Sequence, residues 1–196
     1  MLPTTNLSSR ITTTPPFGLR ASKCPHMHNN KPNRVARRRP LRTVAYVGEP
    51  KVAVLMGSKN DMPLMLGAVE ALQHFDIDTE VRVLSAHRNP NEVQRFVTNA
   101  RIDGYVAIIA GAGKAAHLAG AVAANTTLPV VGVPLSGSLM GMDSLLSTSQ
   151  MPKGVPVATV AIDGSYNAGL LVAQMLAIND IEMAKKLADL REQTSK

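Results

Sequence analysis

This 196-residue chain has one cysteine, no tryptophan and only 3% aromatic residues. The cysteine, Cys24, lies near the amino terminus, so the rest of the chain can form no disulfide and supply no catalytic thiol. No segment approaches the roughly 18 consecutive apolar residues of a transmembrane helix. The few aromatic side chains leave little to stack on nucleic-acid bases. These absences argue against a disulfide-rich protein, a thiol enzyme, a membrane protein and a nucleic-acid-binding protein.

Acidic residues are missing from positions 1–48, which hold nine of the 21 basic residues and none of the 14 acidic ones. Positions 49–196 therefore hold 12 basic and 14 acidic residues, a net charge of −2. The overall charge of +7 thus belongs to the amino-terminal segment. The remainder lacks the basic surface that nucleic-acid binding requires.

Residues 1–48 are rich in Ser, Thr, Pro and Arg and contain no apolar core of a secretory signal. We expect this segment to be a disordered transit peptide, directing the protein to a plastid more readily than to a mitochondrion. The alternative is an ordinary extension, which would leave the protein in the cytoplasm. Cys24, His26 and His28 lack the second ligand pair of a structural zinc site, so we expect no metal there.

Residues 49–196 have the length of one domain, in which apolar strand patterns alternate with helical patterns. Continuous apolar strands indicate a sheet covered on both faces. The pattern therefore predicts a three-layer α/β/α sandwich with a central parallel sheet, flavodoxin-like or Rossmann-like. We expect strands at 51–57, 80–84, 105–110, 129–133 and 157–161, and helices from Pro63 and at 90–100, 115–124, 143–149, 167–177 and 181–191. Small residues in the later helices favour close packing within or between subunits, and methionines such as Met140 favour an oligomer.

Three polar segments follow expected strands: GSKND at 57–61, SAHRNP at 85–90 and AGAGKAAHLAG at 110–120. Open parallel sheets bind ligands beyond the carboxyl ends of their strands, so these segments should converge on one pocket. Hydroxyl groups and an arginine suit a phosphate, and imidazole is the side-chain type that transfers protons near neutral pH. None of the three holds a dense set of metal ligands.

Each segment also has a structural interpretation. Asp61 could serve only as a helix cap, and His87 only as a hydrogen-bonding residue at a strand end. The third segment contains G-x-G-x-x-A, but no acidic residue follows at the distance of a dinucleotide fingerprint. Lys114 is followed by no Ser or Thr, so the segment is not a P-loop. A glycine-rich loop instead allows a flat ring to approach the backbone near His117.

These segments, together with PVVGVP at 129–134, DSLLSTSQMPKGVPVATVAI at 143–162 and NAGLLVAQML at 167–176, resemble a known family. The family is the class I 5-(carboxyamino)imidazole ribonucleotide mutases, also called aminoimidazole ribonucleotide carboxylase catalytic domains or PurE-type proteins. The likeness runs in order and nearly without gaps from about Lys51 to Asp180.

The resemblance implies a purine-biosynthesis isomerase that moves a carboxyl group from the exocyclic nitrogen of an aminoimidazole ribonucleotide to ring carbon 4, without metal or organic cofactor. It implies CO2 as an intermediate, a homo-octamer, and an ATP-dependent synthase as functional partner. Alternatives are direct carboxylation with CO2 and an impaired regulatory subunit. The implied catalytic residues are His87 and His117, and the implied substrate-binding residues are Gly57, Ser58, Asn60, Asp61, Ser85, Ala86, Arg88, Ala112, Gly113, Lys114 and Leu118.

Several positions depart from the family pattern. Asn60 replaces a serine, Ala119 replaces a proline, and the segment LSGSLMGMD is one residue shorter. Lys114 replaces a glycine of the motif GAGGAAHL. If that glycine needs a positive φ, a lysine strains the loop by about 1 kcal/mol. The lysine could alternatively help to hold a carboxylate.

A fluorescent protein fused to residues 1–48 should enter an organelle, a plastid in plant cells, because the segment has the composition of a transit peptide. Deleting residues 1–47 should leave folding and activity unchanged, since the segment has no hydrophobic periodicity. Fluorescence microscopy and activity assays check the two outcomes. A diffuse cytosolic signal would contradict the targeting prediction.

Overall fold

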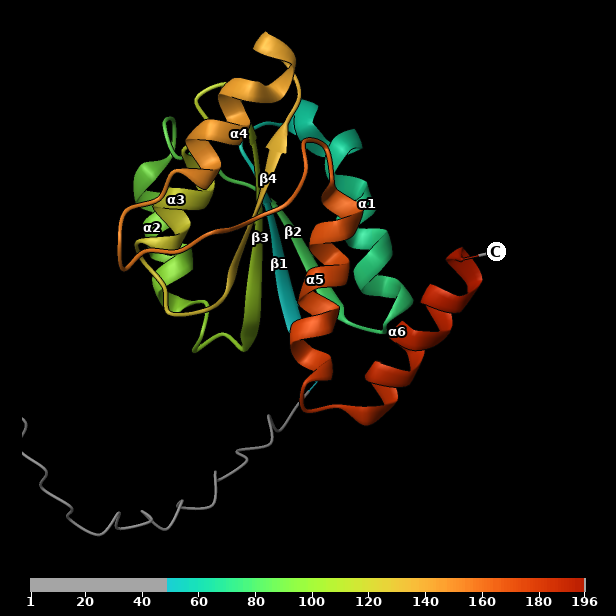
Figure 1. Cartoon of the computed structure of the whole chain (residues 1–196). Helices are drawn as coiled ribbons and strands as arrows, with labels where there is room; N and C mark the ends of the chain where they lie inside the picture. Colours follow the sequence, from blue (N-terminus) through green and yellow to red (C-terminus); the bar gives the residue numbers. More distant parts are fainter. Residues whose placement is uncertain (1–48, 196) are drawn as a thin grey trace, which may run out of the picture. The chain divides into compact units, whose positions relative to one another are not determined.

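The computed structural model describes residues 49–195 (Figure 1). The predicted transit peptide and its boundary at residue 48 lie outside the described residues. The strands are β1 (Lys51–Met56), β2 (Asp78–Val83), β3 (Tyr105–Gly113), β4 (Val130–Leu135) and β5 (Ala158–Thr159). The helices are α1 (Met62–His74), α2 (Pro90–Asn99), α3 (Leu118–Ala123), α4 (Met142–Ser149), α5 (Ser165–Ala177) and α6 (Ile181–Thr194), with 3-10 turns η1 (Lys59–Asp61) and η2 (Ser138–Gly141).

The strands form one sheet in the order β2-β1-β3-β4-β5, and every neighbouring pair is parallel. This is the strand order of flavodoxin-like folds, in which the chain reverses direction across the sheet beside the first strand. The predicted parallel three-layer sandwich is confirmed. None of the helices between residues 49 and 195 combines the length and apolar character that crossing a bilayer requires.

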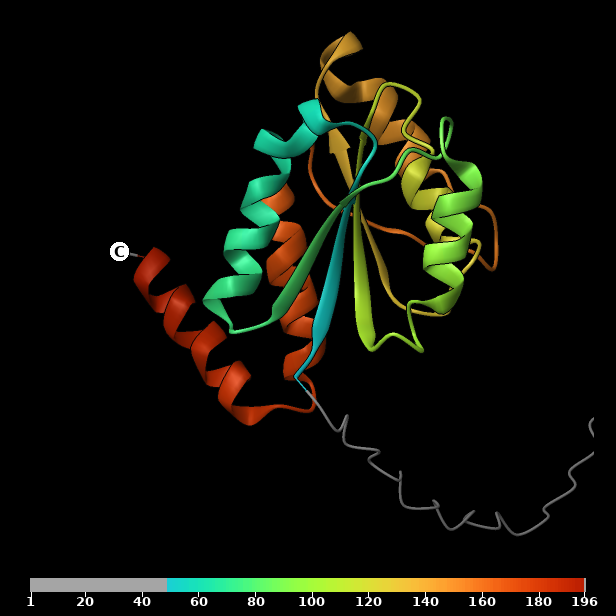
Figure 2. The same cartoon turned by 180° about the vertical axis from the view of Figure 1, so that it is seen from behind.

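Helices cover both faces of the sheet, as the continuous apolar runs indicated, although the edge strand β2 stays partly exposed. In β1, Val52, Val54 and Met56 belong to one core, whereas Ala53 and Leu55 belong to the other. Helices α1 and α5 cover the first face, with α6 packed on the outside of α5, and α2 and α3 cover the second (Figures 1 and 2). The alternation of side chains along a strand thus supplies two cores from one apolar segment.

Helices α1 and α5 approach closely because small residues face one another. A Cβ atom placed on Gly169 of α5 would lie 2.6 Å from the Cβ of Ala71 and 2.8 Å from the carbonyl oxygen of Ala68. No side chain fits in that space, so glycine is required for this helix pair. The small residues of α5 therefore serve packing within the subunit.

Helix α3 starts three residues later than the sequence predicted, and β3 runs three residues further. Lys114 has φ +55°, which a right-handed helix cannot contain, so residues 114–117 form a loop. Strand β3 continues through Gly113 because its last three residues pair with β4. The glycine-rich segment is thereby divided into a strand end and a loop.

An ion network ties the amino-terminal part of the sheet together. Glu80 of β2 pairs with Lys51 of β1 at 2.6 Å and with Arg82 at 2.5 Å, and it accepts a hydrogen bond from the Tyr105 hydroxyl of β3. Hydrogen bonds from Lys51 and Tyr105 lower the pKa of Glu80 to about 2. The hydrogen bond to Glu80 raises the pKa of Lys51 to about 12. Arg82 also lies over the ring of Phe96 of α2, 4.7 Å from its centroid.

Replacing Glu80 with glutamine should reduce the free energy of unfolding at neutral pH by about 1 to 2 kcal/mol. The pKa shift alone would suggest more, but 28% of the side chain stays in water, which weakens the pairing. A lowered pKa stabilises the fold above the unfolded-state value, and this contribution is lost as the pH falls from about 5 towards 2. Urea denaturation across that range should therefore show a flatter decline for Glu80→Gln. Glu70→Gln, at an exposed position on α1 outside the network, is the control, and equal pH dependence of the two variants would contradict the prediction.

Candidate active site

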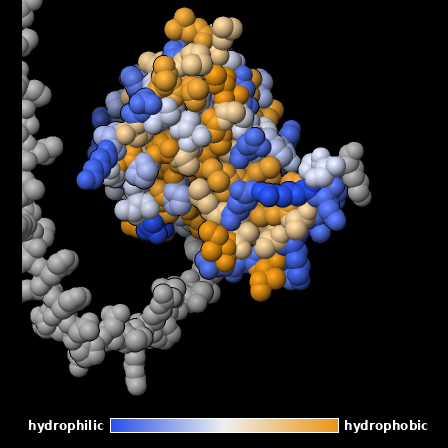
Figure 3. Space-filling view, in the orientation of Figure 1, coloured by the Kyte–Doolittle hydropathy of each residue, from blue (hydrophilic) through white to orange (hydrophobic). Residues whose placement is uncertain are grey.

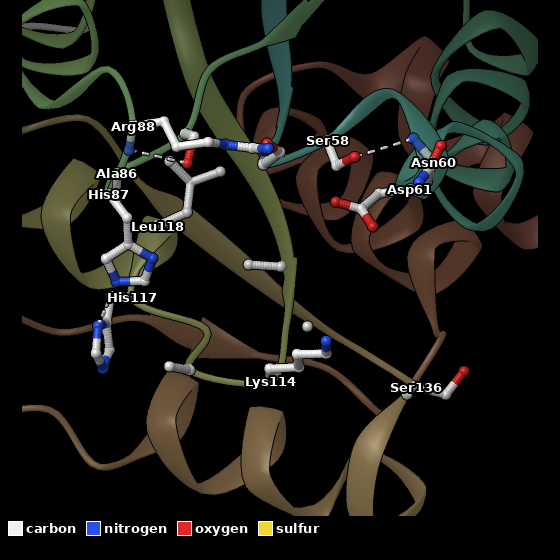
Figure 4. Close-up of a pocket in the computed structure, with 16 residues that line it drawn as sticks. Ser58, Asn60, Asp61, Ala86, His87, Arg88, Lys114, His117, Leu118 and Ser136 are labelled. Carbon is white, nitrogen blue, oxygen red and sulfur yellow. Dashed lines mark hydrogen bonds between the residues drawn. The ribbon is translucent and has the colours of Figure 1, made fainter.

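A cavity of about 530 Å³ opens at the carboxyl ends of β1, β2, β3 and β4 (Figure 4). Its volume is within the usual range for small-molecule sites. The structure brings all thirteen residues singled out from the sequence to its walls: Gly57, Ser58, Asn60, Asp61, Ser85, Ala86, His87, Arg88, Ala112, Gly113, Lys114, His117 and Leu118. Ala115, Ser136 and Gly137 complete the lining.

The first loop, after β1, turns its polar groups into the cavity. The Ser58 hydroxyl accepts a hydrogen bond from the Asn60 amide at 3.2 Å and caps η1. Asp61 follows and is partly buried. Burial, which removes water from the carboxylate, raises the pKa of Asp61 above its ordinary value, although a backbone hydrogen bond from Ser58 and the charge of Arg88 act in the opposite direction.

The second loop is fastened to the first through Arg88. The Arg88 guanidinium donates a hydrogen bond to the Gly57 carbonyl, and the Arg88 amide donates to the Ser85 hydroxyl at 3.3 Å. Arg88 therefore lies between the two loops with most of its five donors still available. The guanidinium and the hydroxyls of Ser58 and Ser85 form a set of donors suited to a phosphate group.

Two imidazoles meet on one side of the cavity. Nε2 of His87 lies 2.8 Å from Nδ1 of His117, and the two rings are nearly perpendicular at 79° (Figure 4). One hydrogen lies between these nitrogens, so one ring donates and the other accepts. Both side chains are exposed to the cavity mouth. The pair can take up or release a proton without losing its internal hydrogen bond, which suits general acid–base chemistry.

The third loop contains strained backbone at Lys114. A left-handed φ of +55° costs a residue with a Cβ atom about 1 kcal/mol relative to glycine. The Ser147 hydroxyl of α4 holds this loop: it accepts a hydrogen bond from the Ala116 amide at 3.0 Å and lies 3.3 Å from the Lys114 carbonyl oxygen. The sequence predicted backbone strain if this position needs a positive φ, and the structure meets that condition.

Sequence reasoning missed Ser136 and Gly137, which follow β4. The sequence predicted a strand that ends at Val133, whereas β4 continues to Leu135. The polar residues that follow this strand therefore begin two residues later than expected. The Ser136 amide donates a hydrogen bond to the Asp163 carboxylate at 2.8 Å, which holds the loop against the start of α5. A serine–glycine pair at the end of the fourth strand was the available signal.

Metal binding finds no support among the described residues, since residues 49–195 contain no group of three or more His, Cys, Asp or Glu placed to hold an ion. The charged groups that line the cavity are Asp61, Arg88 and Lys114, besides the two imidazoles. Side chains and backbone amides of this kind suit a small molecule that carries phosphate and carboxylate groups.

The parallel sheet and this cavity are typical of an α/β enzyme whose site suits a phosphorylated ligand and acid–base chemistry by imidazoles. Residues 51–196 match the family model described as AIR carboxylase, and the chain belongs to that family. It is 50% identical over 147 residues to the N5-carboxyaminoimidazole ribonucleotide mutase of Pyrococcus abyssi, covering 74% of this chain and 84% of that protein. It is 56% identical over 144 residues to the mutase of Saccharolobus solfataricus, covering 73% and 91%.

A longer relative is the phosphoribosylaminoimidazole carboxylase of Candida glabrata, which is 49% identical over 144 residues. The match covers 73% of this chain and 25% of that protein. Among solved structures, Treponema denticola PurE superposes with a TM-score of 0.69 at 29% identity, covering 75% of this chain and 92% of that chain. The fold and the sequence thus lead to the same family.

Replacing Asp61 with asparagine should stabilise the ligand-free protein at neutral pH. A raised pKa in the folded state means that the ionised carboxylate opposes folding, and that the wild-type protein loses stability as the pH rises through the Asp61 titration. The difference between variant and wild type should be largest at pH 7 and disappear in acid, where the carboxylate is protonated in both states. Thermal denaturation checks this, with Asp189→Asn on the exposed face of α6 as control. If Asp61→Asn is less stable than the wild type at pH 7, the ionised carboxylate stabilises the fold and the prediction is wrong.

Proposed function

We propose that this protein is a purine-biosynthesis isomerase that converts 5-(carboxyamino)imidazole ribonucleotide into 4-carboxy-5-aminoimidazole ribonucleotide. The observation that carries the proposal is the contact of His87 and His117 at 2.8 Å in the same cavity as Arg88. Relatives of 50% and 56% identity are named mutases of this substrate, which supports the same reaction here.

Binding begins with the phosphate. Arg88, Ser58 and Ser85 supply the charge and the hydroxyl donors, and the loops that carry them are already joined through the Gly57 carbonyl. Asp61 is the carboxylate on this side of the cavity and accepts hydrogen bonds from the ribose hydroxyls. The site is therefore largely formed before the ligand arrives, which reduces the cost of ordering it.

The reaction moves one carboxyl group and one proton. The N–C bond of the carbamate breaks, CO2 leaves, and protonated His87 gives its proton to the exocyclic nitrogen. Ring carbon 4 then attacks CO2 and forms a C–C bond, after which His87 removes the hydrogen from carbon 4 and restores the aromatic ring. His87 thus ends protonated, as it began, and no external acid or base is consumed. His117 keeps the His87 ring oriented between the two transfers.

Released CO2 needs confinement during this sequence. Residues 112–115 line the cavity, and all but Lys114 are glycine or alanine, so their backbone can lie close to the substrate ring. Leu118, only 2% exposed, forms an apolar wall next to this loop. A small enclosed volume keeps the effective concentration of CO2 high at carbon 4.

We propose further that the protein acts as a homo-oligomer. Leu139 is 73% and Met140 is 86% exposed, and Met142 and Leu146 add to the apolar surface over η2 and α4 (Figure 3). Contiguous exposed apolar surface of this kind favours association. An ATP-dependent synthase would supply the unstable carbamate. Residues 1–48 would direct the enzyme to a plastid.

Replacing His87 with asparagine should lower kcat by about 100-fold or more while nucleotide affinity stays within about tenfold, because a proton shuttle acts on the transition state rather than on the bound ground state. Absorbance of the imidazole products measures kcat, with each substrate assayed with and without bicarbonate. His74→Asn, on α1 outside the cavity lining, is the matched control and should keep wild-type kcat.

Retention of more than about a tenth of wild-type kcat in His87→Asn would remove the histidine from the chemistry. Turnover of the decarboxylated nucleotide only with bicarbonate would favour direct carboxylation. Absence of turnover in the wild-type protein would favour the regulatory subunit.

A further inference from the structure

We propose that Lys114 recognises the carboxyl group of the substrate and makes this enzyme prefer the carboxylated ribonucleotide over the same nucleotide without that group. The inference rests on the proposed function, because it names the residue that reads one group of that substrate. In the resembling family this position is a glycine, so the preference would distinguish this chain from glycine-bearing enzymes.

The backbone conformation of Lys114 supports this role. Lys114 keeps a left-handed φ of +55°, and its side chain, unlike that of asparagine or aspartate, makes no local hydrogen bond that would favour this conformation. Glycine would remove the strain without altering the path of the chain. Backbone strain of this kind clusters at functional sites, where the surrounding structure holds the strained conformation.

The position of the Lys114 side chain at the cavity also supports this role. Strand β3 fixes the loop on one side, and the contacts of the Ser147 hydroxyl with the Ala116 amide and the Lys114 carbonyl oxygen fix it on the other. Lys114 consequently lines the cavity. Figure 4 shows it on the side of Ser136, with the pair of imidazoles on the opposite side.

The charge of Lys114 is available to a ligand. None of the ion pairs formed within residues 49–195 includes Lys114. Among the described lining residues the permanent cations are Arg88 and Lys114, and they come from different loops. The substrate carries two separate anionic groups, a phosphate and a carboxylate. Arg88 lies with the hydroxyl donors of the phosphate region, which leaves Lys114 for the second anion.

The sequence left strain and carboxylate binding open as alternative effects of Lys114. Strain and recognition make different predictions for two substitutions. Lys114→Gly removes both the strain and the charge, whereas Lys114→Met keeps a side chain of similar length at the same φ and removes only the charge. A comparison of the two variants therefore separates the backbone effect from the charge effect.

The experiment measures dissociation constants of two nucleotides by calorimetry, without bicarbonate: 4-carboxy-5-aminoimidazole ribonucleotide and 5-aminoimidazole ribonucleotide. The affinity ratio of the carboxylated to the plain nucleotide should fall about tenfold in both Lys114→Met and Lys114→Gly, as expected for losing one charge-assisted contact. The affinity for the plain nucleotide should change by less than about threefold. Lys114→Arg should retain the ratio. Lys59→Met, on the same rim but outside the cavity lining, is the matched control.

Thermal denaturation of the same proteins supplies a second readout. Lys114→Gly should melt at a higher temperature than the wild type, and Lys114→Met should melt close to it. An unchanged affinity ratio in both variants would overturn the inference while leaving the proposed function intact. If the wild-type protein binds neither nucleotide, the proposed function fails and the inference fails with it.

Discussion

Parallel pairing of every strand is the constraint on which the site depends. Because β1, β2, β3 and β4 run in the same direction, the loops that leave their carboxyl ends emerge at one edge and face one another. Segments centred on Asp61, His87 and Lys114 are thereby brought around a single cavity. The same pairing requires helices on both faces, since a parallel sheet cannot leave one face in water. Covering both faces in turn favours central strands that are apolar throughout, as Val52 to Met56 are.

That dependence explains how far the sequence could be interpreted. Apolar runs bounded by glycine and proline predicted the parallel sheet, the layers and the three loops, because these follow from local pattern and strand direction, whereas the strand order came only from the structure. The contact between His87 and His117 could not be predicted, since its 2.8 Å distance depends on how two loops pack. The Glu80 network was missed for a similar reason: Lys51, Glu80 and Tyr105 meet only through the register of three strands. Ser136 was missed because the length of β4 is set by its pairing with β3.

Backbone strain is distributed unevenly over the fold. Between residues 49 and 195, five residues other than glycine have a positive φ: four (Lys114, Leu139, Met140 and Asp163) lie at the carboxyl end of the sheet, and the fifth, Asp76, follows α1. Asp163 uses its conformation to accept a hydrogen bond from the Ser136 amide. The rigid sheet and the close pairing of α1 with α5 around Gly169 supply the stability that offsets these loops. The well-packed core therefore stabilises a fold whose loops at the carboxyl edge of the sheet contain strained backbone.

The ion network around Glu80 begins at the amino-terminal ends of the strands, whereas the cavity lies beyond their carboxyl ends. Lys51 and Tyr105 begin β1 and β3, whereas Gly57 and Lys114 follow the ends of those strands. A strand of six residues spans about 20 Å, roughly twice the Debye length in physiological salt. Solvent ions therefore weaken the interaction between the partly exposed charge of Lys51 and charges at the cavity. Charges around Glu80 can change, as adaptation to heat or salt demands, while the electric field that an incoming anionic nucleotide meets stays the same.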